Sequence, residues 1–97
     1  MSNKKYGLAY ERKEKQHWES MGYYCHRSRG SFGLFDMIVV DKYRWVLVSV
    51  KSTRDKTKKY TGHLKEIRDF DNAPSGTHKK LIVYRKSKRV EYSCGTI

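Results

Sequence analysis

Two short apolar runs near the middle of the chain dominate its hydrophobic pattern. They are Met37–Val40 and Trp45–Val48, and they are rich in the β-branched and aromatic residues that favour strands. The link between them, residues 41–44, is short and polar, which suits a hairpin loop. The pattern therefore predicts an antiparallel β-hairpin at the centre of the fold.

Polar residues stand at the ends of this hairpin. Asp36 opens the first strand, whereas Ser49 and Lys51 follow the second apolar run. Because strand side chains alternate between faces, Ser49 and Lys51 should point the same way. Antiparallel pairing would bring Asp36 alongside Lys51, so the sequence predicts a small polar cluster on an otherwise apolar hairpin.

The flanking segments predict two helices and three further strands. The expected helices cover 3–21 and 61–72, and the expected strands cover 23–26, 37–40, 45–51, 81–84 and 89–93. Asn3 and Thr61 are the expected N-caps, and Gly22 suits the end of the first helix. The order is α-β-β-β-α-β-β, a mixed α/β sheet flanked by two helices, in which the strands before and after the second helix are parallel.

The length suggests one small domain, and the charge is strongly positive. The 97 residues contain no Ser/Gly-rich linker, so we treat 1–97 as a single domain. The 22 Lys and Arg residues outnumber the 10 Asp and Glu residues, giving a net charge of +12. Such a field attracts a polyanion, most commonly nucleic acid, although a merely soluble lysine-rich surface is the simpler alternative.

Several classes of site and location are not indicated by the sequence. Cys25 and Cys94 lack the spacing of a disulfide pair or metal site, and the four histidines lack zinc spacing. Cys25 falls in an expected strand, where it should be a small core residue. No apolar stretch approaches membrane-spanning length, so we expect an intracellular protein.

Candidate carboxylates lie near the hairpin. Glu11 precedes Trp18 by seven residues and shares its helix face, so its side chain should point inward. The neighbouring charges at 12–14 support the alternative of a solvated glutamate at the edge of that face. Asp36 also has a simpler alternative role, which is to cap the edge of a strand.

Basic segments flank the hairpin on both sides. Residues 27–33 contain two Arg, two Ser and two Gly, and residues 54–60 form a basic connection. Arg and Ser donate to phosphate oxygens, so the first segment predicts a phosphodiester cradle, with a flexible turn as the alternative. The expected DNA contacts are Arg12, Arg27, Ser28, Arg29, Arg54, Lys56, Lys58 and Lys59. Outer contacts are expected at Lys79, Lys80 and 85–89.

Glu11, Asp36 and Lys51, in this order of elements, resemble the PD-(D/E)xK nuclease superfamily. The local sequence motifs are similar to those of the archaeal Holliday-junction resolvase branch and its viral relatives. The matching motifs are Gly7-x-x-Tyr10-Glu11-Arg12, Gly22-Tyr23, Arg27-Ser28-Arg29-Gly30-Ser31, Phe35-Asp36 and Val50-Lys51-Ser52-Thr53-Arg54. The resemblance covers residues 7–54 and continues more loosely through the second helix. It implies a restriction-endonuclease-like core.

The resemblance also implies a divalent-metal-dependent DNA endonuclease. Asp36 would ligate Mg²⁺ or Mn²⁺, with Glu11 and the Val50 carbonyl as further ligands. Lys51 would orient the attacking water and stabilise the charge that develops on the phosphate. A serine of the preceding loop would assist, with Ser31 as the first candidate and Ser28 as the second.

The chain departs from the family motif at Ser49, which occupies the position of the (D/E) acid. One interpretation is that Glu11 and Asp36 suffice, with reduced metal affinity. A second is that Glu66, on the second helix, supplies the missing carboxylate, as happens in some restriction enzymes of this superfamily with a Ser-x-Lys motif. A third is that the site is inactive and the protein only binds DNA. All three remain open from the sequence.

Two functional hypotheses follow. The first is an endonuclease of the Holliday-junction-resolvase type, or a nicking enzyme, that acts on branched or duplex DNA as a homodimer because a symmetric junction needs paired cuts. The second is a non-catalytic DNA-binding or architectural protein on the same scaffold, with salt-sensitive binding. A basic RNA-binding module is a weaker third, because the tyrosines form no stacking motif. We expect no membrane contact and no nucleotide cofactor.

Overall fold

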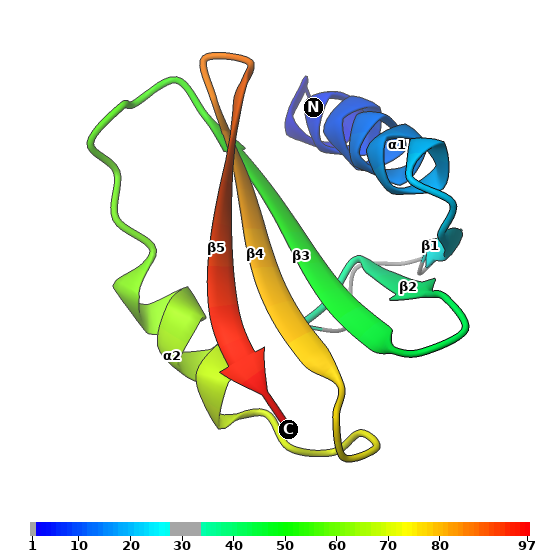
Figure 1. Cartoon of the computed structure of the whole chain (residues 1–97). Helices are drawn as coiled ribbons and strands as arrows, with labels where there is room; N and C mark the ends of the chain where they lie inside the picture. The colour runs from blue at the N-terminus through cyan, green and yellow to red at the C-terminus, as the bar shows by residue number, and fades with distance from the viewer. Residues whose placement is uncertain (1, 28–33) are drawn as a thin grey trace.

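The computed structural model of the chain describes residues 2–27 and 34–97, with the side chains of the first helix described from Leu8 onward. Its elements, in order, are α1 (Ser2–Ser20), β1 (Tyr24–Arg27), β2 (Met37–Val40), β3 (Trp45–Thr53), α2 (Thr61–Asp69), β4 (His78–Arg85) and β5 (Lys88–Thr96) (Figure 1). The predicted order of two helices and five strands is confirmed.

The five strands form one mixed sheet in the order β1-β2-β3-β4-β5. β2 and β3 make the predicted antiparallel hairpin, in which Met37 pairs with Val48. β3 and β4 are parallel, as expected for strands joined through α2, and their pairing runs from Val46 opposite His78 to Thr53 opposite Arg85. This parallel partner explains why β3 and β4 are longer than their apolar runs alone predict.

The helices pack on opposite faces of the sheet and create two apolar clusters. Alternate residues Val46, Val48 and Val50 of β3 join Trp18 of α1 in the first cluster. Ile67 of α2 packs with Leu81, Val83 and other residues on the opposite face of the sheet. Cys25 is buried in the first cluster, as expected, and Cys94 in the second, both as free thiols. The described helices include none that is long and apolar enough to cross a membrane.

The helix ends differ from the predicted ones in detail. α1 begins at Ser2, so Asn3 lies inside the helix rather than at its cap. Gly22 follows α1 with φ of +90°, the left-handed conformation that suits glycine at a helix end. Tyr60, not Thr61, is the N-cap of α2, and no side-chain hydrogen bond supports it. α2 ends at Asp69, because Phe70 is already extended.

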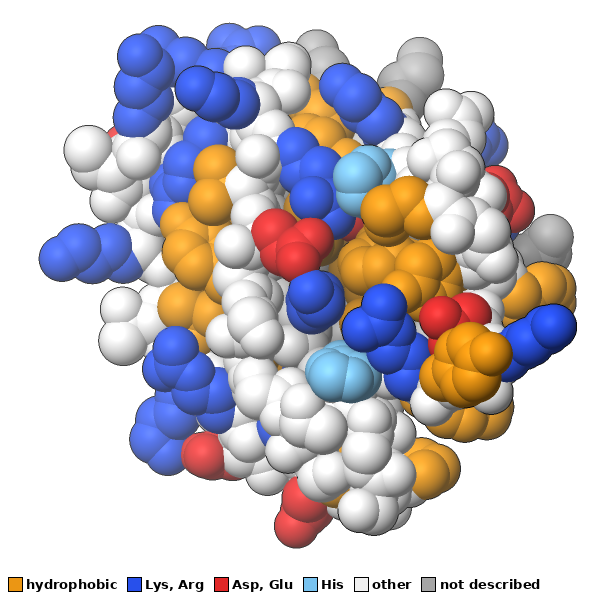
Figure 2. Space-filling model, in the orientation of Figure 1, with side chains coloured by type: hydrophobic (Ala, Val, Ile, Leu, Met, Phe, Trp, Pro, Cys, Tyr) orange, Lys and Arg blue, Asp and Glu red, His pale blue; other side chains and the backbone are white. Residues whose placement is uncertain are grey.

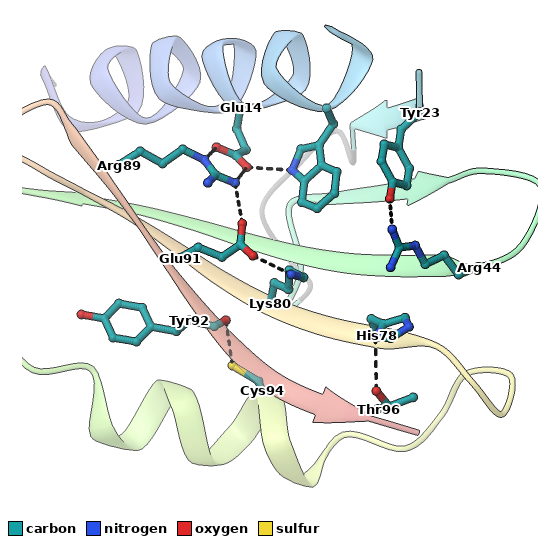
Figure 3. A network of polar contacts seen from close by, with 11 residues as sticks. Glu14, Tyr23, Arg44, His78, Lys80, Arg89, Glu91, Tyr92, Cys94 and Thr96 are labelled. Atoms are coloured by element: carbon teal, nitrogen blue, oxygen red, sulfur yellow. Dashed lines mark hydrogen bonds and ion pairs between the residues drawn. The ribbon is translucent and has the colours of Figure 1, made fainter. Parts of the chain in front are cut away.

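A buried carboxylate joins α1 to the sheet (Figure 3). Glu14 is completely buried, although it stands in a run of charged residues. Its oxygens accept hydrogen bonds from Trp18 Nε1 at 2.7 Å, Tyr84 OH at 2.7 Å, and Arg89 Nε and Nη2 at 2.9 and 2.7 Å. A buried charge is tolerated only when it is paired and hydrogen-bonded, so this network fixes α1 against β4 and β5.

Three basic residues expected as outer DNA contacts make structural interactions within the protein. Arg89 binds Glu14 and also Glu91, at 2.9 Å. Lys80 Nζ donates to Glu91 at 2.5 Å. Lys79 is buried, and its Nζ donates to the carbonyls of Arg68 and Phe70 at 2.6 and 2.8 Å. Lys79 therefore neutralises the carboxyl end of α2 and fixes this helix to the sheet.

Glu14→Gln should destabilise the protein by about 3 kcal/mol, because it leaves the Arg89 guanidinium without its buried partner. Urea denaturation measures the loss. Glu19→Gln is the matched control on the same helix, since Glu19 makes only an exposed ion pair with Lys15 and should cost less than about 0.5 kcal/mol. Equal effects of the two substitutions would contradict the anchoring role of Glu14.

Candidate functional site

Asp36 is the residue just before β2. Here β3 extends beyond its pairing with β2, so its edge on the β2 side has no strand partner among the described residues. The backbone N–H of Asp36 donates to the Val48 carbonyl at 2.8 Å, and its Oδ2 accepts the Val50 N–H at 2.6 Å. The carboxylate thus replaces a missing strand partner, which confirms that Asp36 caps a strand edge. The same contact holds the carboxylate in a fixed position beside β3.

The direction of the Val50 carbonyl is compatible with the metal-ligand role expected for it. The N–H and C=O of one strand residue point to the same side of the strand. Because the Val50 N–H faces Asp36, its carbonyl is directed toward the same edge. The Val50 side chain, in contrast, is buried in the cluster beneath α1.

Glu11 approaches Asp36 from α1. The Glu11 side chain is partly buried, and its Oε1 lies 3.9 Å from Arg27 Nε at the end of β1. Burial raises the pKa of Glu11, the charge of Asp36 raises it further, and Arg27 opposes both. Arg27 Nε is buried and makes no hydrogen bond within the described residues. The charge of the strand aspartate therefore reaches the helix glutamate.

Ser49 and Lys51 share the face of β3 that is covered by α2. Ser49 is 1% exposed, and its Oγ lies 2.8 Å from Nε2 of His63 on α2. Lys51 is exposed beyond it. His63 was missed by reasoning from metal-ligand spacing, although it shares a helical stripe with Ile67 and Phe70 that predicts a position facing the sheet.

Three charged side chains act on the pKa of His63. Burial lowers the pKa of His63, and the positive charge of Lys51 lowers it further. The carboxylates of Glu66 and Asp36 act in the opposite direction. Glu66 itself is exposed on α2. His63 therefore lies among the site residues predicted from both the hairpin and the second helix.

The carboxylate pair fits a divalent cation only in part. Within the described ranges, no three His, Cys, Asp or Glu side chains are grouped closely enough to hold a metal ion by themselves. Mg²⁺, however, commonly binds through one or two carboxylates and completes its coordination with waters and substrate phosphates. Glu11 and Asp36 supply such a pair, and a cation between them would relieve the repulsion that raises the pKa of Glu11.

Basic side chains collect near the carboxyl end of β3. Arg54, Lys56, Lys58 and Lys59 are all exposed on the connection from β3 to α2. Figure 2 shows Lys and Arg side chains at the upper left, over this connection and the β4–β5 turn. Arg12 is exposed on α1, while Arg27 is partly buried against Glu11. Ser28, Arg29 and Ser31 lie outside the described residues.

An apolar groove of about 550 Å³ is formed by residues of β1, β2 and β3 and by the segment that follows α2. It is lined by His26, Leu34, Phe35, Met37, Ile38, Trp45, Leu47, Phe70, Asn72, Ala73, Pro74 and Thr77. None of these is Lys, Arg, Asp or Glu, so the groove has no charged group to engage a phosphodiester. The polar cluster at Asp36, rather than this groove, is the candidate site.

Comparison with known proteins adds no family assignment. No protein-family model matches the chain, and no curated protein matches it.

Glu11→Gln should raise the melting temperature at pH 7. The folded-state pKa of Glu11 lies above its ordinary value, so the folded protein keeps this proton to a higher pH than the unfolded chain. Stability is therefore lost as the pH rises through this interval, and the penalty is fully present at neutral pH. Thermal denaturation monitored by circular dichroism measures the gain.

The gain from Glu11→Gln should vanish below a pH of about 4, where the carboxyl is protonated in both states. Glu19→Gln, an exposed position on α1, serves as the control. A melting temperature for Glu11→Gln at or below that of the wild type at pH 7 would show that the Arg27 ion pair outweighs burial and repulsion.

Proposed function

We propose that the protein is a divalent-metal-dependent DNA endonuclease with a restriction-endonuclease-like core, acting as a junction-resolving or nicking enzyme. The observation that supports the proposal is the position of Asp36, just before β2 and bonded to β3, where its charge acts on Glu11 of α1 and, with that of Lys51, on His63 of α2. The order of helices and strands and the parallel β3–β4 pair support the same scaffold.

Each residue has a definite part in this chemistry. Glu11, Asp36 and the Val50 carbonyl would hold Mg²⁺ or Mn²⁺, which supplies Lewis acidity and lowers the pKa of water when bound. The exposed Lys51 ammonium lies on the same face as Ser49 and can donate to the non-bridging phosphate oxygens as negative charge develops. It also orients the attacking water, which displaces the DNA oxygen from phosphorus.

The basic connection 54–60 provides the binding energy for DNA. Its cations are exposed and adjoin the end of β3 that carries Lys51. Arg85 Nη1 donates to the Asp55 carbonyl at 3.1 Å, which joins this connection to β4. For a symmetric four-way junction, two copies of the chain would provide the two cuts.

Lys51→Ala should reduce metal-dependent DNA cleavage at least ~10²-fold, because it removes charge stabilisation from the transition state. Asp36→Asn should have a similar effect through the loss of the cation. Gel assays with branched and linear DNA in Mg²⁺ or Mn²⁺ measure both. Asp36→Asn is preferred to Asp36→Ala because its amide oxygen can still accept the Val50 N–H and preserve the fold.

Cleavage that survives both substitutions would eliminate this site. Absence of cleavage by the wild type in either metal, together with retained DNA binding, would instead favour the second candidate function. That candidate is a non-catalytic DNA-binding protein, and the observation that favours it is the neutral Ser49–His63 pair at the position where the superfamily has an acid.

Lys56→Gln combined with Lys59→Gln should weaken DNA binding and lower the slope of log K against log salt by about 2, one for each lost phosphate contact. Fluorescence anisotropy over a series of salt concentrations measures the slope. Lys42→Gln, exposed in the turn between β2 and β3, is the control and should leave the slope unchanged. An unchanged slope for the double variant would place the DNA on another surface.

A further inference from the structure

One face of the β1–β2–β3 part of the sheet is apolar and has no covering helix among the described residues. α1 packs on β1 and β3, whereas α2 packs mainly on β4 and β5 (Figure 1). Cys25, Val39 and Val46 are buried beneath α1. Tyr24 and Trp45, whose side chains alternate to the opposite face, are 69% and 48% exposed. We call this opposite surface the open face, and the strand register assigns to it Tyr24, His26, Ile38, Val40, Trp45 and Leu47.

The sequence of β2 is that of a strand covered on both faces. It reads Met37-Ile38-Val39-Val40, four apolar residues without the alternation of a half-exposed strand. Such a run is typical of strands that are buried on both sides. Met37 and Val39 are buried in the cluster beneath α1, but Ile38 and Val40 remain partly exposed. The composition of β2 therefore indicates a second cover on the open face.

We propose that this cover is a second copy of the chain, bound through a two-fold interface in which Trp45 of each copy enters the apolar groove of the other. Trp45 borders both the groove of about 550 Å³ and a second hollow of about 470 Å³. A half-exposed indole thus stands beside a concave surface lined by Leu34, Phe35 and Phe70. A two-fold interface must carry both partners of every contact on one surface, and the open face provides both the ring and the groove.

The charge distribution favours this occupant. The chain carries a net charge of +12, so two copies repel each other through most of their surfaces. None of the residues that line the two hollows is Lys, Arg, Asp or Glu. Arg44, in the neighbouring turn, is directed to Tyr23 and Asp41 instead. The open face is therefore a surface on which two like-charged copies can meet, and it offers no cation to a DNA backbone.

The inference rests on the proposed function, which needs two copies for paired cuts, and it names the surface through which they meet. Phe35 and Met37, on either side of Asp36 in the chain, both line the groove. The interface would therefore adjoin the candidate site in each copy. The two hollows involve fewer residues than the roughly 20–30 per side of a standard interface, so we expect a weak dimer in the micromolar range.

Sedimentation velocity of the full chain, free of nucleic acid, tests the interface without any measurement of cleavage. The wild type should shift from monomer to dimer over a range of micromolar concentrations. Trp45→Lys should raise the dissociation constant of the dimer at least ~30-fold, as the loss of an interface hot spot does. In a mixture of ¹³C-labelled and unlabelled wild type, isotope-filtered NOEs should join the Trp45 indole of one copy to the Ile38 or Leu47 methyl groups of the other.

Tyr43→Lys is the matched control, because Tyr43 is an 89% exposed aromatic residue that lines neither hollow. It should dimerise as the wild type does. Circular dichroism checks that Trp45→Lys is folded; if it is not, the filtered NOEs of the wild type decide, and their absence would overturn the interface.

A wild type that stays monomeric, or a dimer that Trp45→Lys leaves unchanged, would also overturn the interface. Cleavage lost in Asp36→Asn would still support the nuclease in that case. Quenching of Trp45 fluorescence by oligothymidine in a monomeric wild type would assign the open face to unpaired DNA bases instead. A dimer that depends on Trp45 but cleaves no DNA would support the interface and overturn only the nuclease.

Discussion

The buried Glu14 carboxylate is the interaction on which the arrangement of the site depends. It accepts hydrogen bonds from α1, β4 and β5, so the helix cannot rotate or slide without leaving a charge unpaired in the core. Glu11 lies three residues earlier, about one helical turn. The anchor that holds α1 on the sheet therefore also fixes the position of Glu11, whose pKa is raised by the charge of Asp36.

The candidate site concentrates interactions that do not favour folding. Glu11 is partly buried beside Asp36, and its charged form is disfavoured there despite Arg27. Ser49 and His63 place further polar groups between α2 and β3. Elsewhere the protein pairs its buried charges fully, as at Glu14 and Lys79. Repulsion between these carboxylates, which Arg27 offsets only in part, would be relieved by a bound cation, as the proposed function requires.

Local sequence patterns predicted most of the fold and part of the site. The hairpin, the element order and the parallel β3–β4 pair follow from apolar periodicity and chain connectivity. The roles of Glu14 and Lys79 did not, because their partners Arg89 and the α2 carbonyls are far away in sequence. His63 was missed for the same reason: its partner Ser49 lies on another element, and no short spacing motif links them.

The most direct test of this account is the effect of Mn²⁺ on the melting temperature of the whole chain. A ligand that binds only the folded state raises the melting temperature. The account predicts a concentration-dependent rise for the wild type and little or none for Asp36→Asn, which keeps the hydrogen bond to Val50 but loses the charge. An equal rise in both proteins, or none in the wild type, would contradict a cation site at Asp36.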